Sequence, residues 1–246
     1  MHVMTKHYDP QLVYKLAAPE PRGAIVLNPY FHQWTETISG NLETGHSAGI
    51  MYDLGESKEL LSACTAHARA HERKDTTGKC IVLTHPFYLH LTHMAELKNE
   101  TVRQEADEYV DALLHFLCLN RDIFQTPVIL FEMAHHYAAA SSLLVERGLV
   151  DTVIFTVCHS GKPLNQDDVQ QIKHGTLYFG GGYNGRCLRS SIVAVETIRS
   201  STNNLWAIKE LVLTSPYDNW NTLRTSCVSG IAPERTISLE DVLTQL

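Results

Sequence analysis

Short apolar runs rich in β-branched residues recur along this 246-residue chain, and longer stretches with many polar residues separate them. Each run has the length and composition of a β-strand that is buried on both faces of its sheet. Strands without a polar face favour a sheet that is covered on both sides. The runs are AIVLN (24–28), CIVLT (80–84), PVILFE (127–132), TVIFTV (152–157), TLYFG (176–180) and ELVLTS (210–215).

Helical patterns alternate with these runs. Within residues 99–119 the apolar side chains recur at the spacing of one helix face, and residues 57–74, 138–148 and the stretch after Cys187 also have a helical pattern. Parallel strands need crossover connections, and helices commonly supply them. We therefore predict an α/β protein that forms a Rossmann-like three-layer αβα sandwich around a mostly parallel sheet.

The whole chain is expected to fold as a single α/β domain, because 44% hydrophobic composition supplies a substantial core. Residues 79–215 would form this core. Residues 1–78 would add an N-terminal strand and a helical segment that pack on it. Residues 216–246 would be a polar C-terminal extension, which ends in a short helix capped by Ser238.

Composition and charge exclude several classes of partner. The formal charge of −7 and the isoelectric point near 6.0 leave no basic footprint for nucleic acid. No apolar run approaches the ~20 residues of a membrane span, and the first residues lack the pattern of a secretory signal. The six cysteines form no CxxC pair, which is typical of reduced cysteines. We therefore expect a cytoplasmic protein whose partner is a small-molecule ligand or substrate.

Chemically versatile side chains stand where the predicted strands end. The carboxyl ends of parallel strands meet at one edge of a sheet, and ligands of such folds bind at that edge. We therefore expect these side chains to lie along one edge. They are Thr84 and His85, then Glu132, His135 and His136, then Cys158 and His159, and finally Tyr183, Asn184, Arg186 and Cys187.

The glycine-rich stretch before Cys187 has more than one interpretation. Gly180, Gly182 and Gly185 satisfy the G-x-G-x-x-G spacing of dinucleotide-binding turns. A dinucleotide fold places this turn after its first strand and an acidic residue at the end of the next strand. Here the run at 210–215 ends in threonine and serine. Glycines also allow a strand to turn sharply into a helix, so a simple tight turn stays an alternative.

Cys187 stands where a helical pattern begins. Unpaired N–H groups and the positive end of the helix dipole stabilise a thiolate there, and Arg186 adds a positive charge nearby. The sequence thus predicts a low pKa for the Cys187 thiol and the fastest alkylation among the cysteines. The alternative is a small residue that is merely buried.

The segments DTVIFT (151–156) and GTLYFGGGYNGRCLRSSIVAVE (175–196) resemble the isochorismatase-like cysteine hydrolases. In that family a late strand enters a glycine-containing turn, and the nucleophilic cysteine follows at a helix start. The upstream segments KCIVLTHPFY (79–88) and EYVDALLHFLCLNRDIFQTPVILFE (108–132) are similar to the first strand, long helix and second strand of the family. The resemblance therefore spans about residues 79–215 and implies that Cys187 is a nucleophile.

Two catalytic positions of that family are filled differently here. Where the family keeps an aspartate at the end of its first core strand, this chain has Thr84 and His85. Where the family keeps a lysine, this chain has Thr156 at the strand end and Lys162 only later in the loop. These departures leave three hypotheses for function open.

In the first hypothesis the chain hydrolyses small amides or esters. Cys187 is the nucleophile, and His85 or His159 accepts its proton. Backbone N–H groups of residues 185–187 would bind the oxyanion. The substrate pocket would consist of Thr84, Tyr183, Asn184 and Arg186.

In the second hypothesis the chain holds a divalent metal such as zinc that activates water. Glu132 and one of His135 and His136 would be ligands, because neighbouring residues at a helix start cannot both point inward. His85 or His159 would complete the set. Nicotinamidases, which belong to the resembled family, bind a metal beyond their second strand.

In the third hypothesis the chain is a Rossmann-like domain that binds a metabolite or a partner without catalysis. The absence of the family's catalytic aspartate and lysine favours this hypothesis. The segment SPYDNWNTLRTSC (215–227) leaves the last predicted strand at the functional edge. It is either a lid over the site or a surface that packs against a second copy in a homo-oligomer.

Overall fold

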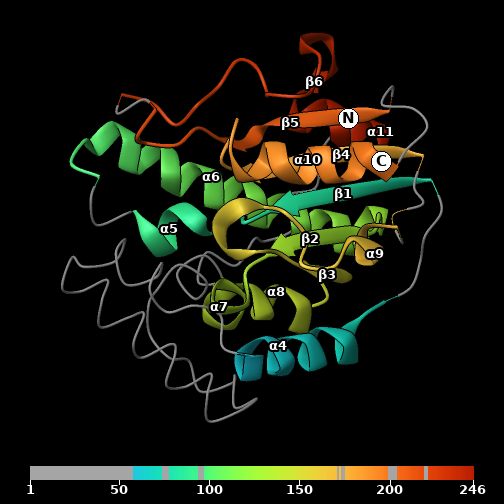
Figure 1. The fold of residues 1–246 in the computed structure, drawn as a ribbon. Coiled ribbons are helices and arrows are strands. Elements are labelled where there is room, and N and C mark those ends of the chain that lie inside the picture. The colour runs from blue at the N-terminus through green and yellow to red at the C-terminus, as the bar shows by residue number, and fades with distance from the viewer. Residues whose placement is uncertain are drawn as a thin grey trace.

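The computed structural model describes residues 58–73, 78–93, 97–170, 172, 175–198, 204–218 and 221–246. The strand expected at residues 24–28, and most of the predicted N-terminal segment, lie outside the described residues. Within the described part, six strands form one sheet in the order β3-β2-β1-β4-β5-β6, and every neighbouring pair is parallel (Figure 1). This order is that of doubly wound dinucleotide-binding folds. The chain therefore has the predicted Rossmann-like α/β architecture.

The strands lie where the apolar runs predict them. Four of these strands agree with the predicted runs to within two residues at either end. They are β1 (Lys79–Thr84), β2 (Val128–Glu132), β3 (Thr152–Phe155) and β4 (Thr176–Gly182). Alternate residues of β1 face opposite sides of the sheet: Ile81 and Leu83 belong to one buried cluster, and Cys80 and Val82 to the other. The sheet therefore has a hydrophobic core on each face.

Helices cover both faces. The first core contains residues of α4 (Lys58–His71), α6 (Glu100–Leu119), α8 (Ser142–Glu146) and α11 (Leu239–Gln245). The second core contains residues of α9 (Gln166–Val169) and α10 (Cys187–Ile198). These two sets of helices on opposite faces produce the three-layer sandwich (Figure 1).

Shorter helical turns connect these elements. Helix α5 (Tyr88–Thr92) follows β1, and a π-helix (Asn120–Phe124) ends α6. After β2 the chain stays helical from α7 (Ala134–His136) through a π-helix (Tyr137–Ser141) into α8, so this helix starts before the predicted residue 138. Two 3-10 turns lie at Cys158–Ser160 and Pro233–Arg235.

The C-terminal part of the sheet departs from the sequence prediction. β5 (Leu205–Leu213) begins five residues before the predicted run at 210–215, and its pairing with β4 shifts between Phe179 and Gly181. Lys209 and Glu210 interrupt the apolar pattern at this irregularity, which hid the first half of the strand. The extension also adds an unpredicted strand, β6 (Thr236–Ile237), to the sheet.

The predicted cap of the last helix is confirmed. The Asp241 N–H donates a hydrogen bond of 3.1 Å to Ser238 Oγ, and the Glu210 carboxylate accepts one of 2.8 Å from the Leu239 N–H. Glu210 thus connects the irregular part of β5 to α11. Among the described helices, none is both long and apolar enough to cross a bilayer.

Candidate functional site

From β1 the chain adds β2 and β3 on one side of the sheet, and it then returns to add β4, β5 and β6 on the other side. The order of the strands therefore reverses between β1 and β4. Helices α6 and α10, which come after these two strands, lie on opposite faces, and folds of this class bind their ligands at such a point, outside the carboxyl ends of the strands. His85, Glu132, His159 and Cys187 stand at or just after the ends of four parallel strands. The prediction that they share one edge is confirmed.

Glycine lets β4 approach β1 closely at this edge. Gly180 and Gly181 pair with Leu83 and Thr84, and Gly182 is still part of β4. Gly181 has a φ of +108°, and a Cβ atom there would overlap the Thr84 carbonyl group. The first two glycines of the G-x-G-x-x-G spacing are therefore strand residues, which argues against a phosphate-binding loop, and only Gly185 belongs to the turn.

A group of imidazole and phenol rings fills the space behind this edge, and we call it the rim cluster. The Tyr88 ring lies at its centre, with centroids 5.3 Å from His136 and 5.2 Å from Tyr183. At one end the His93 ring is 5.0 Å from Tyr217, whose side chain is exposed. The cluster therefore runs from the interior to the surface. It consists of His85, Tyr88, His93, His135, His136, Tyr183 and Tyr217.

The carboxylate of Glu132 is fully buried beside the rim cluster. It accepts hydrogen bonds from the Met133 N–H at 3.0 Å and the Ser141 hydroxyl at 2.7 Å. Its Oε1 lies 3.6 Å from Nδ1 of His136. Burial raises the pKa of this carboxyl above its ordinary value, while the nearby His85 and these two hydrogen bonds act in the opposite sense.

Three buried histidines of the cluster, His85, His135 and His136, are held neutral. Burial lowers the pKa of His85 to about 4, although the charge of Glu132 opposes this shift. Burial lowers the pKa of His135 and of His136 to about 3, and neighbouring histidines add to the effect. Each ring therefore has one N–H donor and one acceptor nitrogen at neutral pH.

Several of these nitrogens have no hydrogen-bond partner. Nε2 of His85 lies 2.9 Å from the Thr156 hydroxyl, but its Nδ1 is unpaired. Both ring nitrogens of His136 are buried and unpaired among the described contacts. A buried polar atom without a partner costs about 1–3 kcal/mol. The edge of the sheet thus concentrates unsatisfied hydrogen-bonding capacity.

The thiol of Cys187 does not have the predicted low pKa. Burial raises its pKa to about 12, which outweighs the opposing backbone hydrogen bonds. The Tyr183 N–H donates to Sγ at 2.7 Å, and the S–H donates to the Gly182 carbonyl at 2.7 Å. Arg186 instead turns outward to Asp218, with hydrogen bonds of 2.7 and 3.1 Å. Burial therefore decides the charge state, and the cysteine stays a protonated thiol.

The loop after β3 covers the start of α10. Gly161, with a φ of +72°, lies so close that a Cβ atom there would overlap the Cys187 carbonyl group. The His159 side chain before it is largely exposed, and partial burial lowers its pKa. In the described structure the hydrogen-bond partners of Sγ are backbone groups, so neither His85 nor His159 is hydrogen-bonded to the thiol.

Of the predicted pocket residues, only Tyr183 belongs to the rim cluster, where its hydroxyl lies 2.8 Å from Nδ1 of His93. Thr84 is fully buried, and its hydroxyl lies 2.6 Å from the Ser191 hydroxyl of α10. Asn184 donates to the Cys227 carbonyl at 2.9 Å and accepts from the Ser229 N–H at 2.7 Å. The polar groups of Thr84, Asn184 and Arg186 are thus engaged in contacts within the protein.

The predicted metal ligands do not assemble in the described part of the chain. No group of three or more His, Cys, Asp or Glu side chains there is arranged to hold a metal ion. Of the two candidate histidine ligands, His135 and His136, it is His136 that approaches Glu132 closely. The histidine pair instead contributes its rings to the cluster.

Sequence reasoning missed the contribution of α5. Tyr88 and His93 are central to the rim cluster, yet they follow β1 by several residues and match no known ligand spacing. The available signal was composition, because HPFYLHLTH (85–93) holds three histidines and two aromatic residues directly after a strand end.

The segment after β5 packs beside the same edge. Glu105 of α6 accepts hydrogen bonds from the Thr222 hydroxyl at 2.9 Å and the Leu223 N–H at 2.6 Å. Asn184 binds residues 227 and 229 farther along. Tyr217 touches His93, so this segment contacts the rim cluster directly. Its predicted function as a lid or as a surface between two copies stays a prediction.

Comparison with models of known protein families, with curated proteins and with solved structures finds no match. The resemblance to the isochorismatase-like hydrolases therefore stays a prediction.

Proposed function

We propose that this chain is a binding domain for a small planar molecule, uncharged or weakly basic, that docks at the rim cluster. One observation carries the proposal: Nδ1 of His85 and both ring nitrogens of His136 are buried without partners at the edge where the strand order reverses. A ligand that supplied these partners would recover the free energy that the unpaired atoms cost.

The chemistry of the cluster favours an uncharged ligand. Neutral imidazoles offer both a donor and an acceptor, which suits amides and heteroaromatic rings. The described members of the cluster carry no lysine or arginine, so an anion would meet no permanent cation. The rings of Tyr88 and Tyr183, 5.2 Å apart, favour a flat molecule that can pack against aromatic faces.

Binding without catalysis is also supported by the state of Cys187. A buried thiol with a raised pKa, bonded to a carbonyl group, is a poor nucleophile because the thiolate is the reactive species. Neither His85 nor His159 is hydrogen-bonded to it. The site therefore lacks two ingredients of cysteine hydrolysis in this conformation.

Cysteine hydrolysis of small amides or esters is the second candidate, because the Tyr183 N–H points at Sγ from the turn before α10. Such a donor would stabilise a thiolate if a substrate displaced the bond to Gly182. Hydrolysis of p-nitrophenyl acetate and activated anilides by the purified chain tests it. A rate that disappears in both Cys187→Ser and His85→Ala would establish this candidate, and equal rates in all three proteins would eliminate it.

Thermal unfolding with a probe panel tests the binding proposal. Benzamide, nicotinamide and adenine are planar and uncharged near neutral pH, and benzoate is the matched anion. We expect at least one neutral probe to raise the Tm of the wild type more than benzoate does. His136→Leu removes both unpaired nitrogens at similar volume, so it should keep the Tm of the free protein and abolish the response.

The matched control is His115→Leu, because His115 is an exposed histidine of α6. This variant should respond to the probes as the wild type does. The proposal is wrong if no neutral probe raises the Tm, or if His136→Leu responds as strongly as the wild type.

A further inference from the structure

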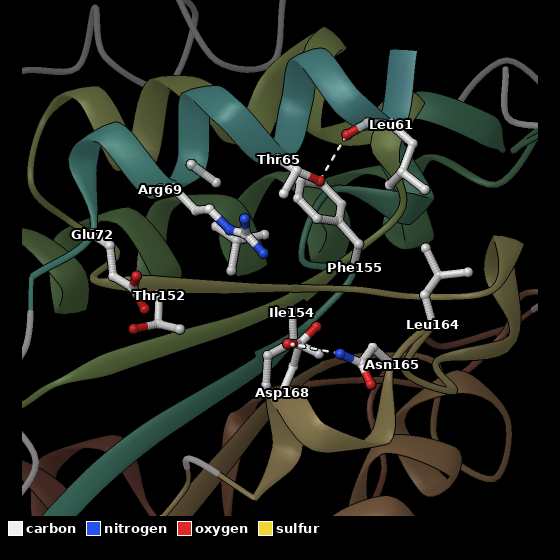
Figure 2. A pocket seen from close by; sticks show the side chains of 12 residues that line it. Leu61, Thr65, Arg69, Glu72, Thr152, Ile154, Phe155, Leu164, Asn165 and Asp168 are labelled. Carbon is white, nitrogen blue, oxygen red and sulfur yellow. Dashed lines mark hydrogen bonds between the residues drawn. The ribbon is translucent and has the colours of Figure 1, made fainter. Parts of the chain in front are cut away.

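A concave site lies along the outer edge of β3, away from the rim cluster. β3 is the terminal strand of the described sheet, and a cavity of about 270 Å³ runs between this strand, helix α4 and the start of α9 (Figure 2). We call it the edge groove. Its volume is near the lower end of small-molecule pockets, which start at about 300 Å³.

One end of the edge groove is apolar. Leu61 of α4 and Leu164 of the following loop lie on opposite walls there, and Phe155 of β3 lies between them (Figure 2). The Phe155 side chain is buried, whereas Leu164 is among the most exposed large apolar residues in the described chain. An exposed leucine over a buried aromatic floor favours contact with an apolar group.

The remainder of the groove carries charges of both signs. Arg69 reaches from α4 into the groove, Glu72 lies near its polar end, and Asp168 stands on the opposite wall (Figure 2). No ion pair joins Arg69 to a carboxylate of the described residues, although five other arginines there form such pairs. Arg69 is therefore available to a ligand.

The side chains of Thr65 and Asn165, which also line the groove, are already engaged. The Thr65 hydroxyl donates to the Leu61 carbonyl at 2.7 Å. Asn165 donates weakly to Oδ1 of Asp168 at 3.4 Å and accepts the N-cap hydrogen bond of α9. Among the described residues Oδ2 of Asp168 accepts no such hydrogen bond, and the Asp168 side chain lies on the opposite side of β3 from Arg69 (Figure 2).

We propose that the edge groove binds a free amino acid with an apolar side chain. The Arg69 guanidinium would bind the α-carboxylate, because its planar fork matches carboxylate geometry. The α-ammonium group would face Asp168 and Glu72. The side chain would lie over Phe155 between Leu61 and Leu164. Separated charges over an apolar floor match a zwitterion with an apolar side chain better than a simple ion.

Isothermal titration of the full chain with L-leucine tests the proposal. Two analogues each lack one charge: leucinamide has no carboxylate and 4-methylpentanoate has no ammonium group. We expect saturable binding of L-leucine, weakened at least about tenfold in Arg69→Gln, because the variant loses the charge-assisted hydrogen bonds to the carboxylate. Leucinamide should bind the wild type and Arg69→Gln equally weakly.

Three further variants locate the site. Asp168→Asn should weaken L-leucine but leave 4-methylpentanoate unchanged, because only leucine has the ammonium group. Lys98→Gln removes an exposed positive charge elsewhere and should change nothing. His136→Leu should also keep leucine binding, which separates this site from the rim cluster. The proposal is overturned if L-leucine gives no saturable signal, or if it binds Arg69→Gln as tightly as the wild type.

Discussion

The thiol of Cys187 donates its proton to the carbonyl oxygen of Gly182 at 2.7 Å, and this bond closes the first turn of α10 onto the end of β4. Burial and this bond together stabilise the neutral thiol. A cysteine at the start of a helix is therefore not by itself an activated cysteine, because the desolvation of its charged form outweighs the helix dipole here.

The first prediction concerns alkylation. Among the cysteines whose side chains are described, Cys227 is exposed and Cys187 is buried. Brief iodoacetamide treatment at neutral pH should therefore label Cys227 before Cys187, as peptide mapping would show. Cys227→Ser should remove the fast label, and denaturant should then expose Cys187. Rapid labelling of Cys187 in the folded protein would contradict this order.

The second prediction concerns acid stability. His85 has a pKa of about 4 in the folded protein and 6.5 as its ordinary value, so the unfolded chain binds more protons between these values. The contribution of neutral His85 to the free energy of unfolding is complete above pH 6.5 and is lost as the pH falls towards 4. The pKa shift of His85 changes the free energy of unfolding by on the order of 3 kcal/mol between these limits.

Urea unfolding at pH 7, 6 and 5 measures this loss. His136 shifts in the same direction, so His136→Leu should reduce the slope of stability against pH. Glu132 makes the opposite contribution to this slope, because its pKa is raised in the folded protein and it therefore binds more protons there than in the unfolded chain. A slope of stability against pH that is the same in the wild type and in His136→Leu would show that His136 is not buried as a neutral group.

The third prediction compares two glycines with the same backbone conformation. Gly161 and Gly185 both have a φ of +72°, but a Cβ atom at Gly161 would overlap Cys187, while Gly185 has open space. Gly185→Ala should cost about 1–2 kcal/mol for the left-handed conformation alone. Gly161→Ala should cost clearly more, because the loop must also move away from α10. Equal losses in chemical denaturation would argue against the close contact.

The fourth prediction concerns the segment after β5. Glu105 binds the Thr222 hydroxyl and the buried Leu223 N–H, so Glu105→Ala leaves a donor unpaired and should cost about 1–3 kcal/mol. The neighbouring Glu108 makes an exposed ion pair with Arg224, and Glu108→Ala should cost less than about 1 kcal/mol. Hydrogen exchange at Leu223 should accelerate only in Glu105→Ala. Matching exchange rates in the two variants would contradict this assignment.

Local sequence patterns were sufficient for the architecture. The runs at 80–84, 127–132, 152–157 and 176–180 are strands because apolar β-branched segments of this length can be buried on both faces only inside a sheet. The parallel order follows from the helices between them. The cap at Ser238 was also readable, since capping depends on neighbouring residues.

The predictions failed where a contact joins distant parts of the chain. β6 has two residues and no pattern of its own, and its partner β5 has an irregularity that conceals its first half. A short strand forms because a neighbouring strand offers free N–H and C=O groups. Such a partner cannot be identified from the two residues themselves.

The sequence by itself determined which residues reach the carboxyl edge of the sheet, because each follows a strand whose direction the alternating pattern dictates. Only the tertiary structure decided their chemical state. His136 meets Glu132 and Tyr88, and Cys187 is enclosed by Gly161 and the end of β4. Protonation depends on desolvation and on neighbouring charges, and both arise from residues far away in the chain.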